Sequence, residues 1–326
     1  MNHKRRERIA ANEISELKTY TLGGYQQKVL IEGKYKSNPI VIFLHGGPGF
    51  PIPFCEGCRG MFPEFTEHFI IVYWDQLGCG INNCKIEDTF SVESFVTMTV
   101  ELVQEIKKEY PENPVSLFGV SWGSVLAAKA AERVPEMIDR VLTYGQALKQ
   151  LTFNEEVYQA LESSNMPLKL RQQLEGIKSK DNHTIRELKS VMKWVQKYTE
   201  GYQSKSGGKS IIGSFLVGIL TSPDYSLKDV VAIFINGYVK NKSLMEELLE
   251  TDLSEVFRHI RIPYLILQGD TDIVTSTKTI TEFAESVEND NIMVRCIKNS
   301  GHMPGIEAMD YIIRDGFEFL DGRRNS

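Results

Sequence analysis

The sequence predicts an α/β protein, with a mostly parallel central sheet flanked by helices and a block of helices inserted into it. Short, uninterrupted apolar runs alternate with amphipathic stretches in residues 39–145 and again after residue 260. Such runs are typical of strands buried on both faces. The stretch between these two regions has helical patterns and no such runs. We therefore expect a core of residues 1–145 and 259–326, and a helical cap of residues 146–258 inserted after the sixth strand.

Composition and charge narrow the class of protein. The chain has 326 residues, 42% hydrophobic and 25% charged, as in ordinary globular proteins. A net charge of −6 without a basic patch disfavours nucleic acid as a partner. No apolar run is long enough to span a membrane, and the N-terminal region lacks the apolar centre of a signal peptide. We therefore expect no membrane partner and a cytoplasmic location, and we interpret the basic cluster Lys4–Arg8 as a solvated, frayed tail.

The cysteines do not indicate a metal site. The chain has five, an odd number that argues against a disulfide framework. Their arrangement superficially resembles a four-thiolate zinc pattern, formed by Cys55, Cys58, Cys79 and Cys84. However, residues 67–73, which separate the two pairs, read as a core strand and not as a zinc-ribbon loop. We therefore interpret these cysteines as reduced thiols near loops and expect no bound metal.

Strands and helices alternate along both parts of the expected core. An antiparallel edge strand is expected first, at residues 26–32. The alternation that follows implies parallel strands joined by right-handed crossovers. Core strands are expected at 39–44, 69–73, 114–118, 138–144, 262–268 and 292–297, and helices at 92–109, 124–132 and 277–287, with cap helices around 154–163, 184–200 and 242–250.

Polar side chains lie at the carboxyl ends of these strands, where parallel sheets gather ligands and catalytic groups. His45, Asp75 and Ser121 all fall at such ends. Ser121 is the centre of a G-x-S-x-G sequence between a strand and a small-residue helix, which is the context of a nucleophile elbow. That turn is strained and requires small flanking residues, here Gly119 and Gly123. We therefore predict that Ser121 is a catalytic nucleophile.

A serine hydroxyl needs an adjacent base that is itself oriented by an acid. His302 follows the last expected core strand and Asp272 follows the one before it, so the chain order is Ser, Asp, His. Asp270 is a close rival to Asp272. We favour Asp272 as the acid because it lies farther past the strand end, and we expect Asp270 to cap or stabilise the turn.

The tetrahedral intermediate of acyl transfer needs two backbone N–H donors. One is expected to be the amide of Trp122, directly after the nucleophile. The other is expected from the loop after the strand at 39–44, where Gly47 lets the amide approach the substrate. We expect His45, in the same loop, to hold it by hydrogen bonds and not to take part in the chemistry.

Together these motifs resemble the prolyl aminopeptidase (proline iminopeptidase) family of α/β-hydrolases. The resemblance implies an eight-stranded sheet, a helical cap, the catalytic triad named above and no cofactor. It further implies removal of an N-terminal proline from a short peptide or similar small substrate, with cap glutamates binding the free amino group. The motifs that carry it are HGGPG at 45–49, DQLGCG at 75–80, GVSWGS at 119–124, GDTD at 269–272 and GH at 301–302.

The sequence departs from this family at several positions. The second motif usually carries arginine and ends in serine, but Leu77 and Asn82 stand there. In the cap segment 235–238, Ile235 stands where the family has an amine-binding glutamate, and an ammonium group is costly to bury without a carboxylate. The family's Trp-Glu-Gly segment has a loose echo around Glu200. We expect Glu200 and Tyr238 to bind substrate, but the proline specificity does not follow from the motifs.

These observations leave three functions open. The preferred one is a serine hydrolase that cleaves a small amide or ester through an acyl-enzyme, with removal of an N-terminal residue from a peptide favoured. A carboxylesterase or lactonase acting on a small ester is the alternative. A more remote alternative is a hydrolase fold that binds a ligand under its cap without catalysis.

Overall fold

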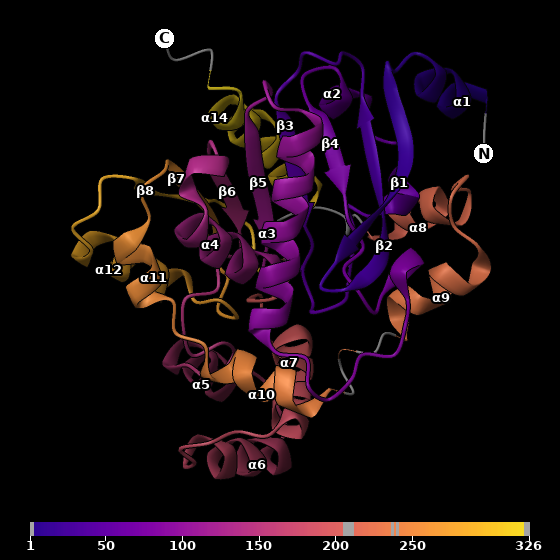
Figure 1. Ribbon diagram of the computed structural model, residues 1–326. Helices are drawn as coiled ribbons and strands as arrows, with labels where there is room; N and C mark the ends of the chain where they lie inside the picture. The colour runs from indigo at the N-terminus through magenta and orange to yellow at the C-terminus, as the bar shows by residue number, and fades with distance from the viewer. Residues whose placement is uncertain (1–2, 205–211, 236–237, 239–240, 323–326) are drawn as a thin grey trace.

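The computed structural model describes residues 3–204, 212–235, 238 and 241–322, and in them eight strands form one sheet (Figure 1). The strand order is β1-β2-β4-β3-β5-β6-β7-β8. Strand β2 pairs antiparallel with β1 and with β4, and the remaining pairs, including β7 with the edge strand β8, are parallel. This confirms the predicted fold class. The strands are β1 Ile14–Leu22, β2 Tyr25–Gly33, β3 Ile40–Leu44, β4 Ile70–Tyr73, β5 Val115–Val120, β6 Val141–Tyr144, β7 Tyr264–Gly269 and β8 Ile292–Ile297.

Helices cover both faces of the sheet because its central strands are apolar on both faces. All five residues of β3 are buried. Ile40 and Ile42 pack into one hydrophobic cluster with α3 and α4, whereas Val41 and Phe43 pack into a second with α2 and α14. The helices of this core are α1 His3–Ala10, α2 Pro63–Thr66, α3 Val92–Glu109, α4 Trp122–Arg133, α12 Thr277–Ser286, α13 Ile306–Tyr311 and α14 Phe317–Asp321, with short 3-10 turns η1 Glu56–Cys58 and η2 Gly80–Asn82.

All the regular secondary structure described between β6 and β7 is helical. Figure 1 shows α5, α6, α7 and α10 gathered at one end of the sheet. Helices α8 and α9 lie apart from these and contact η1 and η2 of the core. The division into a core and a cap domain remains a prediction. The inserted helices are α5 Glu155–Glu162, α6 Leu168–Lys178, α7 Ile185–Tyr198, α8 Ile212–Leu220, α9 Leu227–Phe234, α10 Lys242–Glu250 and α11 Ser254–His259.

The N-terminal region differs from the expectation. The expected frayed tail is helix α1, in which Arg5 is only 6% exposed. The Arg5 guanidinium donates to the carbonyl oxygens of Gly57, Arg59 and Gly218, and these long-range contacts hold the helix against both the core and α8. The edge strand is also not 26–32 but β1, which pairs along its whole length with β2.

The described residues bring no metal-binding group together. All five cysteines are free thiols, and Cys55 Sγ and Cys58 Sγ, 3.5 Å apart, form a hydrogen bond and not a disulfide. In the described part of the chain, no group of three or more His, Cys, Asp or Glu side chains could hold a metal ion. Among the described residues, no helix is both long enough and apolar enough to cross a bilayer.

Candidate active site

Ser121 occupies a sharp turn between β5 and α4. Its φ of 51° and ψ of −115° are unusual for a residue with a side chain. The turn exists because its neighbours lack side chains: a Cβ on Gly119 would lie 2.6 Å from the carbonyl oxygen of Gly123, and one on Gly123 would lie 1.9 Å from that of Leu44. The turn therefore holds the Ser121 hydroxyl beyond the carboxyl end of β5.

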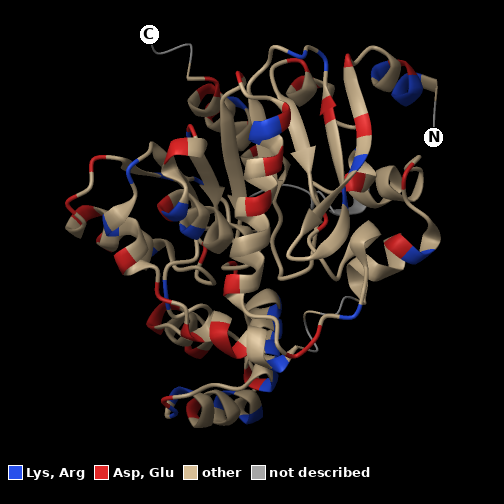
Figure 2. Cartoon of the chain, viewed as in Figure 1, with Lys and Arg blue, Asp and Glu red and all other residues tan. Residues whose placement is uncertain are grey.

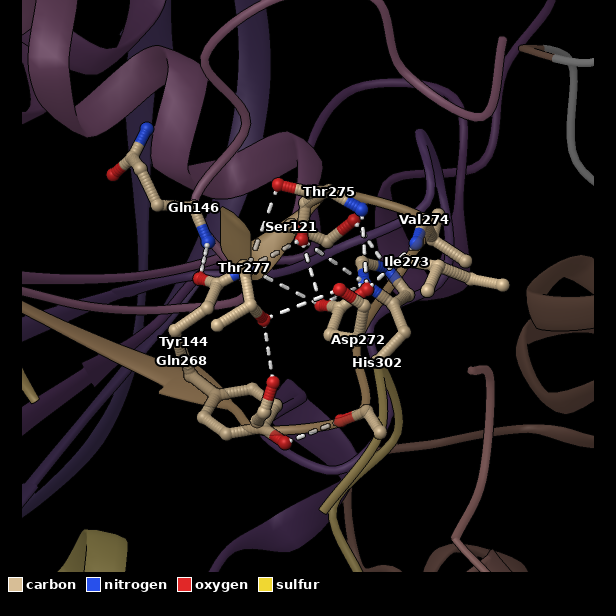
Figure 3. Close-up of polar contacts among 12 residues, drawn as sticks. Ser121, Tyr144, Gln146, Gln268, Asp272, Ile273, Val274, Thr275, Thr277 and His302 are labelled. Atoms are coloured by element: carbon tan, nitrogen blue, oxygen red, sulfur yellow. Dashed lines mark hydrogen bonds and ion pairs between the residues drawn. The ribbon is translucent and has the colours of Figure 1, made fainter. Parts of the chain in front are cut away.

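The three residues predicted as nucleophile, base and acid meet at this turn (Figure 3). Ser121 Oγ lies 2.9 Å from His302 Nε2, and His302 Nδ1 lies 2.9 Å from Asp272 Oδ2. With the proton on Nδ1 donated to the carboxylate, Nε2 is free to accept the hydroxyl proton. The arrangement can therefore activate a serine hydroxyl for attack on a carbonyl carbon.

Asp272 is held in place by a dense set of hydrogen bonds. Its side chain is buried, and Oδ1 accepts from the backbone N–H groups of Val274 and Thr275 at 2.8 and 3.1 Å. The Thr275 hydroxyl donates to Oδ2 at 2.7 Å. Asp270, the rival candidate, instead accepts from the backbone N–H of Ser300 at 3.0 Å. The carboxylate that contacts His302 is thus that of Asp272, and Asp270 supports the turn.

The loop that carries His302 is anchored from both sides. The Tyr144 hydroxyl, at the end of β6, contacts Ser300 Oγ at 2.7 Å and donates to the Gly301 carbonyl oxygen at 2.5 Å. The His302 backbone N–H donates to the carbonyl oxygen of Gly201 at 3.1 Å. Gly201 and its neighbour Glu200 belong to the inserted region, so this hydrogen bond brings that segment directly beside His302.

The loop after β3 faces the same site. Gly47 has a φ of +121°, and a Cβ there would lie 2.6 Å from the backbone nitrogen of Gly49. His45 is the first residue of this loop; its Nε2 accepts from the backbone N–H of Gln76 at 3.0 Å, and Gln76 Oε1 accepts from the indole N–H of Trp122 at 2.8 Å. Burial lowers the pKa of His45 to about 4, so its ring is neutral and can accept this bond. His45 thereby ties the β3 loop to the elbow.

A small apolar cavity of about 120 Å³ opens beside Ser121. Gly47, Trp122 and His302 line it together with Ser121, so the predicted oxyanion residues and the base face the same space. No Asp, Glu, Lys or Arg side chain is among the described residues that line it. Its apolar walls come mainly from the inserted helices and the segment before them: Leu151, Leu188, Met192, Met245, Leu248 and Leu249.

The two residues predicted to bind substrate do not line this cavity. Tyr238 is buried, and its ring packs against Phe95 of α3 at a centroid distance of 5.1 Å. The backbone carbonyl of Glu200 accepts from the Thr271 hydroxyl at 3.1 Å. Their roles in binding remain predictions.

Sequence reasoning missed several residues of the site. Thr275 contacts the Asp272 carboxylate, and Gln268 of β7 donates to the Thr275 hydroxyl at 3.0 Å. A threonine three residues after the acid is a signal that could have been noticed. The apolar residues from α7 and α10 gave no such signal, because helical periodicity does not say which apolar face lies over the serine.

The fold and this site define a hydrolase of the α/β class. The chain belongs to the alpha/beta hydrolase fold family, which matches residues 39–308. The expected resemblance to the proline iminopeptidases is also confirmed, at low sequence identity.

Similar proteins extend over most of the chain. A probable aminopeptidase, YbaC of Bacillus subtilis (strain 168), is 23% identical over 90% of this chain and 92% of its own length. A proline iminopeptidase of Heyndrickxia coagulans is 23% identical over 86% of this chain and 90% of its own. The crystal structure of a proline iminopeptidase from Mycobacterium smegmatis has a TM-score of 0.63, with 15% identity over 94% of this chain and 97% of that one. The last similarity concerns the fold alone.

Proposed function

We propose that the chain is a serine hydrolase that cleaves a small substrate through an acyl-enzyme, and that it acts as an aminopeptidase on apolar N-terminal residues. The observation that carries the hydrolytic part is the continuous contact from Ser121 Oγ through the His302 ring to Asp272, with 2.9 Å at each step. These distances are those of a hydroxyl poised for proton transfer to a base.

The proposed reaction follows from this geometry. His302 Nε2 takes the hydroxyl proton as Ser121 Oγ attacks the substrate carbonyl carbon, and the carbonyl oxygen becomes an oxyanion. The backbone N–H groups of Trp122 and Gly47 donate to that oxyanion. His302 then gives its proton to the departing amine or alcohol, which leaves an ester on Ser121. Water, deprotonated by His302, hydrolyses the ester and restores the hydroxyl, while Asp272 keeps the ring oriented throughout.

Two observations support an aminopeptidase. The relatives that span most of the chain include a probable aminopeptidase and a proline iminopeptidase. The cavity beside Ser121 is apolar and of about 120 Å³, a size close to the ~150 Å³ that accommodates a benzene ring in an apolar cavity. It therefore suits a proline ring or a small aliphatic side chain. The carboxylate we propose to pair with the substrate's amine is that of Glu200, whose neighbour Gly201 accepts from the His302 backbone N–H.

An ester substrate is the second candidate, because the cavity lining itself favours it. The described lining residues include no carboxylate, and an unpaired ammonium in such a cavity is costly. An ester of a small, uncharged, apolar acyl group would bind there without any counter-charge. Glu200 would then have no part in binding.

A side-by-side substrate panel separates the two candidates. The purified chain is assayed on the arylamides of proline, alanine and leucine and on aryl esters of acetate and butyrate. We expect arylamide cleavage, with a KM for the arylamides raised about tenfold or more in Glu200→Gln because the ammonium loses its counter-charge. Glu175→Gln, on the exposed side of α6, is the matched control and should behave as wild type. Fast ester turnover without arylamide cleavage would instead establish the esterase.

A further inference from the structure

We propose that helices α8 and α9 form a docking surface for an anionic lipid bilayer. Nine large hydrophobic side chains are exposed in the described part of the chain, and six of them lie within residues 217–235. We call these six the apolar face: Val217, Leu220, Leu227, Val231, Phe234 and Ile235. Exposed apolar clusters of this kind mark surfaces that bind another protein or a membrane. This proposal departs from the expectation that the chain has no membrane partner.

The opposite side of these helices is already packed against the core. Ile219 of α8 and Ile233 of α9 are buried, and the ring of Phe215 lies 5.5 Å from that of Phe62. The two helices are therefore apolar on both sides. Apolar side chains on both sides of a helix are normally buried on both, so one layer of the expected packing is not supplied by the described residues.

The segment between the two helices is fixed to the core by polar contacts. Asp224 pairs with Arg59 at 2.9 Å, with both side chains largely buried. The Tyr225 hydroxyl donates to the carboxylate of Asp75, which lies under it. These contacts fix the inner side of the helices and so keep the apolar face pointing outward.

The basic side chains of α1, beside the apolar face, indicate which partner binds there. Helix α1 is bound to α8 through Arg5, whose guanidinium donates to the Gly218 carbonyl oxygen at 2.7 Å, and it exposes Lys4 and Arg6. Figure 2 shows this basic helix on the same side of the molecule as α8 and α9. Together, α1 and residues 212–235 hold five basic and three acidic side chains, an excess of two positive charges in a chain of net charge −6.

Anionic lipid fits this combination better than a second copy of the chain does. A second copy would bring the same positive excess to the interface, and like charges facing each other disfavour association. An anionic headgroup layer offers opposite charge to α1, and the acyl boundary beneath it accepts apolar side chains. A bilayer surface therefore matches both the apolar face and the cations of α1 beside it.

The apolar face also contacts the loop after β3, which contains Gly47. The ring of Phe234, at the end of α9, packs edge-on against that of Phe50 at 6.3 Å. The backbone N–H of Phe50 donates to the Gly46 carbonyl oxygen at 3.1 Å, which closes the turn that contains Gly47. Docking would therefore bring the lipid surface next to a loop that lines the cavity beside Ser121.

Vesicle co-sedimentation tests the proposal without any assumption about the reaction. The full chain is incubated with vesicles of phosphatidylcholine alone, or of equimolar phosphatidylcholine and phosphatidylglycerol, at low and high salt. We expect binding to the anionic vesicles at least about tenfold stronger than to the neutral ones, and weaker at high salt. The double variant Leu227→Glu, Val231→Glu should lower it at least about tenfold, and so should Lys4→Glu, Arg6→Glu.

The matched control is Leu168→Glu, which places the same charge on an equally exposed leucine of α6, away from the apolar face. It should bind vesicles as wild type does, and circular dichroism should show that all variants are folded. Equal vesicle binding by wild type and the Leu227/Val231 double variant would overturn the proposal, as would no binding to anionic vesicles. A wild-type dimer that this double variant converts to a monomer would assign the face to a second copy and overturn the lipid assignment.

Discussion

Glu56 shows how strongly a single buried carboxyl can couple this fold to pH. It is fully buried in η1, where Oε1 accepts from the backbone N–H of Asp75 at 3.1 Å and from the Asn82 amide at 3.3 Å. Burial, and next the nearby Asp75 carboxylate, raise the pKa of Glu56 well above its ordinary value of 4.5. Between pH 4.5 and this raised pKa, the folded chain therefore keeps a proton on Glu56 that the unfolded chain releases.

The sign of the effect follows from this difference in bound protons. Above pH 4.5 the folded state binds more protons at Glu56 than the unfolded state, so the free energy of unfolding falls as pH rises toward the folded-state pKa. Burial also raises the pKa of Asp75 from 3.8 to about 6, which acts in the same sense but only up to that pH. The lowered pKa of His45 acts in the opposite sense, between about 4 and 6.5. Of the three, Glu56 is therefore the group that can extend the fall in stability above pH 6.5.

We therefore predict that Glu56→Gln flattens the pH dependence of stability above pH 6.5. The amide keeps the Oε1 contacts but has no proton to lose. Urea unfolding of the wild type should show a loss of up to roughly 1.4 kcal/mol per pH unit as the pH rises toward the folded-state pKa of Glu56, and the variant should lose much less. An unchanged slope in Glu56→Gln would show that Glu56 is already ionised in the folded state. The exposed Glu175→Gln serves as control.

At the scale of elements, the unit that sets the site is β5, the Ser121 turn and α4 packed against β3. The start of α4 approaches β3 so closely that Gly123 has no room for a Cβ. Because the group it would meet is the Leu44 backbone carbonyl and not a flexible side chain, the helix or the strand would have to move.

Gly123→Ala should therefore destabilise the fold, by about 2 kcal/mol or more, because overpacking in a rigid core displaces backbone. Chemical denaturation of the purified variant measures this. The control is Gly176→Ala in α6, where a Cβ would meet nothing within 4 Å. In a helix this change should stabilise by roughly 0.5–1 kcal/mol. If Gly123→Ala were as stable as wild type, the close approach of α4 to β3 would be wrong.

For the whole molecule, the sequence predicted the parts that depend on local pattern. The parallel strands were predictable because they are buried on both faces and read as uninterrupted apolar runs, and α3 was predicted at its observed bounds, Val92–Glu109. Strand β1 was missed because it is an edge strand with mostly polar, partly exposed residues. Helix α1 was missed because the contacts of Arg5 join residues more than 50 positions apart.

The residues of the candidate site also differ in whether the sequence could predict them. Ser121, Asp272 and His302 each follow a strand whose neighbour in the sheet can be deduced from the alternation, so their meeting could be expected from topology. The apolar walls of the cavity come from α7 and α10, whose orientation over the sheet depends on packing between distant segments. This is why the chemistry could be predicted more fully than the substrate.

Covalent labelling of Ser121 tests the central claim most directly. A fluorophosphonate probe reacts only with an activated serine, so the wild type should carry one adduct, mapped by mass spectrometry to Ser121. Ser121→Ala should give no adduct and lose turnover at least roughly a thousandfold, with an unchanged unfolding transition. An unlabelled wild type, or a Ser121→Ala variant that still turns over substrate, would contradict the account.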